Sequence, residues 1–158
     1  LGCFFLFAWF WFTILGGTGE FVDPSISPVF LEGLRGIYYA NSTFFIFSQE
    51  FEGFYVPIVK KIRITIPANS TEKQTTNFQI LLCHELLHHY WNTKLDAETK
   101  EKWRASYNIY AARFGEKETR EFVGPYQEYA VEYLSLKYPG ICYNDANIDQ
   151  IYNPPALK

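Results

Sequence analysis

The 158-residue sequence contains no methionine, and several other residue types are scarce. Because methionine is missing even at position 1, we expect the chain to be a fragment whose true start lies upstream. Three cysteines are too few for a fold built on disulfides. A formal net charge of -3 gives no overall basic field, which argues against a general nucleic-acid binder and against a cationic membrane-surface protein.

Large aromatic side chains, in contrast, are abundant, with 15 Phe, 12 Tyr and 4 Trp. This composition excludes disorder for most of the chain, because disordered segments are poor in such residues. The length suits one compact domain with a core of its own and is too short for two full-sized domains.

An apolar segment opens the chain: residues 3–15 include no charged side chain, and the first charge is Glu20. As a helix, about 15 residues span about 22 Å, which is short of the ~30 Å hydrocarbon core of a bilayer. We interpret residues 1–19 as the remnant of a transmembrane anchor or of a signal peptide, with a buried core helix as the alternative. Residues 20–158 are the predicted domain, and we expect it to be extracytoplasmic, either membrane-anchored or secreted.

Two of the cysteines, Cys83 and Cys142, lie within that predicted domain. Export to an oxidising compartment would allow them to pair, whereas in a reducing compartment both would be buried thiols. Residues 41–43 and 69–71 match the N-glycosylation sequon, which matters only in a eukaryotic secretory route and otherwise describes two polar turns.

The two halves of residues 20–158 differ in pattern. Up to about Pro67 the chain is rich in Gly, Pro and aromatic residues, which predicts short strands and loops. The clearest predicted strand is residues 61–66, whose three isoleucines alternate with polar residues and share one face. Farther along, apolar spacing predicts three helices. The first runs from about residue 77 to 91, the second has Asp96 as its N-cap and ends at Gly115, and the third runs from Pro125 to just before Pro139. The tail from residue 141 is predicted to be a loop. This order is typical of an α+β domain.

All three histidines of the chain fall within residues 84–89. His84 and His88 are one helical turn apart on the same face, so their imidazoles can bind one zinc ion. Glu85 is then close enough to act on a zinc-bound water without binding the metal itself. His89 lies about 100° around the helix from His88, so we interpret it as a residue that supports a ligand or faces solvent. The alternative is a histidine cluster without metal, either exposed or bonded to backbone.

A catalytic zinc ion takes three protein ligands and leaves a fourth position for water. Our candidate for the third ligand is Glu128 in the last predicted helix, with Cys142 as the alternative. Glu132 follows one turn later, so one carboxylate can bind zinc while the other accepts a hydrogen bond from a zinc-bound histidine. We therefore predict Glu128 as a ligand and Glu132 as the support of His84 or His88. Two exposed surface acids are the alternative interpretation.

The His-Glu-x-x-His motif of residues 84–88, followed by Glu-Tyr-Ala-Val-Glu at residues 128–132, resembles the gluzincin group of zinc metallopeptidases. In that group the third ligand is a glutamate on a later helix, with an acid one turn after it. The gap between His88 and Glu128 is longer than in thermolysin-like enzymes and nearer to that of the lethal-factor-like branch.

This resemblance implies a zincin-like fold, in which the edge strand of a small mixed sheet borders a cleft beside the active-site helix. Residues 61–66 are the candidate edge strand, to which an extended peptide could add. The implied activity is zinc-dependent peptide-bond hydrolysis, with Zn²⁺ held by His84, His88 and Glu128 and with Glu85 as general base. Two alternatives remain: an inactive or structural zinc domain, and a membrane-anchored module that binds a protein partner. The oligomeric state is left open.

Overall fold

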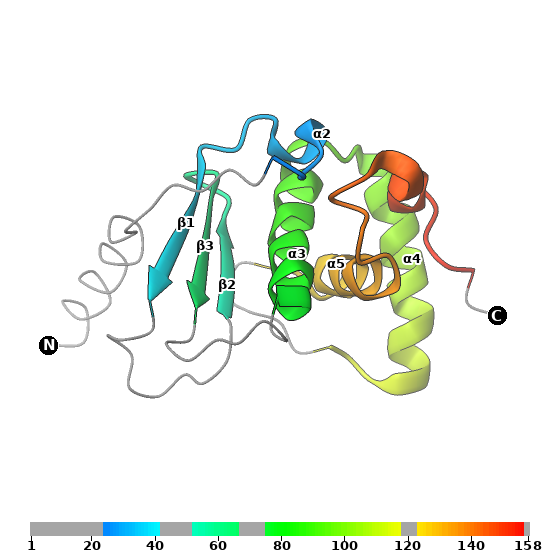
Figure 1. Ribbon diagram of the computed structural model, residues 1–158. Coiled ribbons are helices and arrows are strands. Elements are labelled where there is room, and N and C mark those ends of the chain that lie inside the picture. Colours follow the sequence, from blue (N-terminus) through cyan, green and yellow to red (C-terminus); the bar gives the residue numbers. More distant parts are fainter. Residues whose placement is uncertain (1–23, 42–51, 67–74, 118–122, 157–158) are drawn as a thin grey trace, which may run out of the picture.

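The computed structural model describes residues 24–41, 52–66, 75–117 and 123–156 (Figure 1). The apolar segment of residues 1–19 and the second sequon lie outside these ranges. Among the helices within them, none combines the length and the hydropathy of a membrane-spanning segment.

The described residues form a mixed α and β fold, as the sequence pattern predicted. The helix α3 lies between the sheet on one side and the helices α4 and α5 on the other (Figure 1). The elements in chain order are α2 (Pro28–Leu31), β1 (Gly36–Asn41), β2 (Glu52–Val56), β3 (Lys61–Ile66), α3 (Thr75–Thr93), α4 (Ala97–Phe114), α5 (Pro125–Lys137) and the 3-10 helix η3 (Asp145–Ile151).

The described strands form one sheet in the order β1-β3-β2, with β1 parallel and β2 antiparallel to β3. The predicted strand of residues 61–66 is confirmed as β3, but its expected place at the edge is wrong. It is the central strand, because β1 pairs with one of its sides and β2 with the other. Its isoleucines Ile62 and Ile64 are fully buried. The edge strand that packs on α3 is β2.

The helices agree closely with the sequence pattern. The Asp96 side chain caps α4 by accepting a hydrogen bond from the Thr99 N–H at 2.6 Å, and Gly115 ends that helix with a positive φ of 92°. The tail was expected to be loop, but it contains η3. This short helix is held in place because Ile151 is buried and its carbonyl accepts a hydrogen bond from the Trp103 indole N–H at 2.7 Å.

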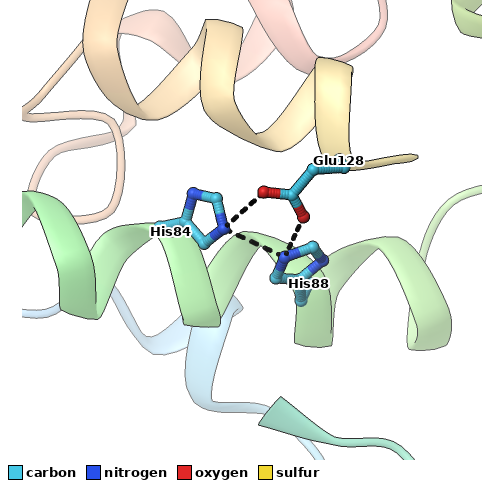
Figure 2. Close-up of side chains that lie close together, drawn as sticks. All are labelled: His84, His88 and Glu128. Carbon is cyan, nitrogen blue, oxygen red and sulfur yellow. Dashed lines mark hydrogen bonds and ion pairs between the residues drawn. The ribbon is translucent and has the colours of Figure 1, made fainter. Parts of the chain in front are cut away.

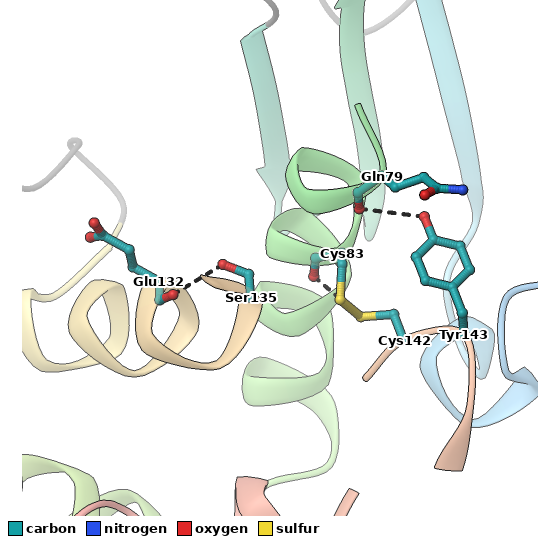
Figure 3. The surroundings of a disulfide bond; sticks show 6 residues. All are labelled: Gln79, Cys83, Glu132, Ser135, Cys142 and Tyr143. Atoms are coloured by element: carbon teal, nitrogen blue, oxygen red, sulfur yellow. Dashed lines mark hydrogen bonds between the residues drawn. A yellow bond between two sulfur atoms is a disulfide. The ribbon is translucent and has the colours of Figure 1, made fainter. Parts of the chain in front are cut away.

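A disulfide joins Cys83 on α3 to Cys142, just after α5, with Cα atoms 5.6 Å apart (Figure 3). Of the two states that the sequence left open, the structure has the paired one. Nearby, the Tyr143 hydroxyl donates a hydrogen bond of 3.4 Å to the Gln79 carbonyl. The chain after α5 is therefore attached to α3 at two neighbouring points.

Candidate metal centre

Three potential metal ligands converge where α3 meets α5 (Figure 2). Glu128 Oε1 lies 3.5 Å from His84 Nε2, and Glu128 Oε2 lies 3.3 Å from His88 Nε2. The two Nε2 atoms are 3.1 Å apart. Tetrahedral zinc with bonds of about 2.0 Å separates neighbouring ligand atoms by about 3.3 Å, so both the donor atoms and their spacing suit such an ion.

The local structure accounts for this convergence. The two histidines share a face of α3 because they are four residues apart in a continuous helix. Glu128 lies in the first turn of α5, which begins at Pro125 and packs directly on α3. The buried residues Ala130 and Leu134 anchor α5 in the core, so the carboxylate is carried by a fixed element.

The electrostatics favour an ionised Glu128. Burial alone would raise the pKa of its carboxyl, but hydrogen bonds and charge interactions with His84 and His88 outweigh burial and hold that pKa well below its usual range. A carboxylate must be deprotonated to bind a metal ion. The two imidazoles therefore keep Glu128 in the form that a ligand requires.

The residue that contacts the outer nitrogen of His88 is Gln127, not Glu132. The Gln127 amide lies 3.1 Å from His88 Nδ1 and is buried. The Glu132 carboxylate instead forms an ion pair with Lys117, and within the described residues it contacts neither histidine. The predicted supporting contact of Glu132 is therefore not the one observed, because Lys117, from the segment after α4, reaches this position on α5.

Sequence reasoning missed Gln127 because a glutamine carries no metal-ligand signal. What marks Gln127 is the burial of its amide beside His88, and burial is not visible in the sequence. Cys142, which was the alternative to Glu128 as the third ligand, forms the disulfide with Cys83 and is not part of the cluster.

Glu85, the predicted general base, is only 4% exposed. Its side chain extends from α3 against Gly53 of β2, the edge strand. The carboxylate therefore lies between the sheet and the helix that carries both histidines.

His89 was predicted either to support a ligand or to face solvent, and its burial excludes the second of these placements. Its Nε2 lies 3.0 Å from the Glu32 carbonyl oxygen, and its Nδ1 lies 3.0 Å from the Tyr55 hydroxyl. Burial lowers the pKa of His89. In the neutral ring Nε2–H donates to the carbonyl and Nδ1 accepts from Tyr55, so His89 connects α3 to β2 and is not part of the metal cluster.

Comparison with protein-family models, curated proteins and solved structures finds no match to this chain. The class of the protein must therefore be inferred from its structure, which is a mixed α and β fold in which two imidazoles and one carboxylate form a candidate metal centre.

Proposed function

We propose that the protein is a zinc-dependent metalloendopeptidase of the gluzincin type. The observation that carries this proposal is the convergence of His84, His88 and Glu128, whose ligand atoms all lie within 4.8 Å of one another. Two histidines with one carboxylate are typical of a catalytic zinc site, whereas structural sites usually have four protein ligands. Within the described residues no fourth His, Cys, Asp or Glu joins this group.

The proposed roles follow from the chemistry of each side chain. Bound zinc would supply a Lewis acid for the scissile carbonyl and a water of lowered pKa. His84 and His88 would hold the ion through their imidazoles, and Glu128 would offer an ionised carboxylate. Glu85 takes the proton of the attacking water and passes it to the leaving amine.

The sheet supports the zincin-like interpretation in a form different from the one first expected. An extended peptide can bind by adding as a strand at a sheet edge. Here the edge strand beside the histidine helix is β2, so we assign the substrate-binding role to β2 and not to β3. The proposed substrate is accordingly a peptide or protein in extended conformation.

The Cys83–Cys142 disulfide supports a location outside the cytoplasm. Disulfides form and persist in oxidising compartments and are rare where thiols are kept reduced. Anchoring or export through residues 1–19 remains a prediction from the sequence.

The test combines metal analysis with peptide cleavage on the full chain. We expect about one zinc ion per chain in the wild type and in Glu85→Gln, and much less in Glu128→Ala. Glu132→Ala is the matched control, an acid on the same helix that contacts Lys117, and it should retain zinc. Cleavage of a peptide library should occur with the wild type and be lost in Glu85→Gln.

The other outcomes distinguish the alternatives. Absence of zinc from the wild type would make the histidine cluster incidental and favour an interaction module. Zinc without cleavage would favour a structural or inactive zinc domain. Full cleavage by Glu85→Gln would exclude Glu85 as the general base.

A further inference from the structure

Gly53 is buried in the edge strand β2, opposite Ile64 of the central strand. The side chain of Glu85 occupies the space where a side chain at Gly53 would lie. A Cβ atom on Gly53 would be 2.6 Å from Glu85 Oε1, 2.8 Å from its Cγ and 3.0 Å from its Cδ. The contact therefore involves much of the glutamate side chain and not only its flexible end.

The backbone does not account for a glycine here. Among the described glycines, those with positive φ are Gly33, Gly36 and Gly115, so Gly53 has a conformation open to other residues. Glycine in a strand interior weakens the strand and often marks the close approach of another group. At Gly53 that group is Glu85, which is almost fully buried and is confined by dense packing.

We propose that Gly53 is a positioning residue for Glu85: the missing side chain determines where the carboxylate of the general base lies. This inference depends on the proposed hydrolase function. A general base must come within about 2.6–3.2 Å of the proton that it takes, so a displaced carboxylate loses activity. The metal cluster should not be disturbed, because its contacts lie between α3 and α5 and do not involve β2.

The first experiment measures Gly53→Ala for zinc content and for the separate kinetic constants of peptide cleavage. We expect zinc to be retained, kcat to fall about 100-fold because the base is displaced, and KM to change little. The matched control is Gly140→Ala, whose Cβ would meet only Asn144 Nδ2, at 3.8 Å. It should retain both zinc and cleavage. Unchanged kcat in Gly53→Ala would overturn the proposal.

A thermal double-mutant cycle tests the same contact without relying on activity. Gly53→Ala should lower Tm in the wild type but not in a Glu85→Ala background, where the obstructing side chain is gone. If Gly53→Ala alone does not fold, the double variant should fold again. An equal effect in both backgrounds would show that Glu85 is not the group that requires glycine.

The two proposals can fail separately. If the protein binds zinc and cleaves peptides but the Tm effects of the Gly53 and Glu85 substitutions are additive, the role of Gly53 is overturned and the proposed hydrolase function stands. Coupling in a protein that neither binds zinc nor cleaves peptides would overturn both functional statements, because there would be no base to position.

Discussion

The two nitrogens of His88 have different neighbours. Nε2 faces Glu128 at 3.3 Å, and Nδ1 faces the Gln127 amide at 3.1 Å. A metal ion on Nε2 requires a proton on Nδ1, and that proton needs an acceptor. The amide of Gln127 offers an oxygen as well as a nitrogen, and the two exchange places by rotation of the amide group. A neutral side chain can therefore orient this histidine.

Replacing Gln127 by Leu should weaken zinc binding about 10- to 100-fold, because Nδ1 of His88 loses its buried hydrogen-bond partner. Competition with a zinc-chelating dye measures the affinity. Gln79→Leu is the control, the same substitution at an exposed position on α3. Equal affinities for both variants and the wild type would show that Gln127 does not support the site.

At this scale the sequence predicts residue types better than partners. The same-face placement of His84 and His88 follows from the helix period, and the structure brings Glu128 to both. Glu132 lies one helical turn after Glu128, and this spacing predicted that it would contact a histidine, yet it contacts Lys117. Helical spacing says which side chains share a face, but the neighbours on that face come from other elements.

At the scale of elements, α4 shows how a local signal defines a helix start. The Asp96 carboxylate accepts hydrogen bonds from Thr99, and these hold the pKa of Asp96 below its ordinary value. A carboxyl group whose pKa is lower in the folded state stabilises the protein above the unfolded pKa. This contribution is lost as the pH falls through the lower folded pKa.

We expect Asp96→Ala to lower Tm by a few degrees at neutral pH, because the first turn of α4 loses its cap. Asp96→Asn should keep a cap without the charge. The difference in Tm between the wild type and Asp96→Asn should shrink as the solution is acidified below the ordinary aspartate pKa. Circular dichroism melts of all three proteins over this pH series measure it, and a difference independent of pH would contradict the assignment.

The strands show the limit of local signals. Alternation in residues 61–66 predicted β3 and its buried face, but nothing in that pattern says which strands pair on either side. β2 pairs with β3, the next strand along the chain, and it lies at the edge because β1, which comes earlier in the sequence, pairs with the other side of β3. Likewise η3 forms in an Asn- and Pro-rich tail because Trp103 and the core hold Ile151.

For the whole molecule, the Cys83–Cys142 disulfide closes a loop with a sequence separation of 59 and includes α4 and α5 within it. It also places a covalent link directly before His84. The arrangement of α3 relative to the chain after α5 is therefore constrained in the unfolded state as well as in the folded one.

Removing this disulfide in Cys83→Ala/Cys142→Ala should lower the free energy of unfolding by about 4 kcal/mol, from the loop entropy that the unfolded chain regains. Urea denaturation with and without saturating zinc measures the loss, and zinc bound to the folded state should restore part of it. Wild-type protein treated with a reductant is the comparison. If reduction leaves its urea midpoint unchanged, the predicted contribution of the disulfide is wrong.

The sequence by itself determined the features that depend on nearby residues: the face shared by His84 and His88, the cap at Asp96 and the alternation in residues 61–66. These follow from the fixed periods of helix and strand and from local hydrogen bonding. Only the tertiary structure decided that Glu128 reaches the histidines, that Gln127 contacts His88 and that Glu85 packs on Gly53. Such contacts join residues far apart in the chain, and they depend on how complete helices and strands pack around a common core.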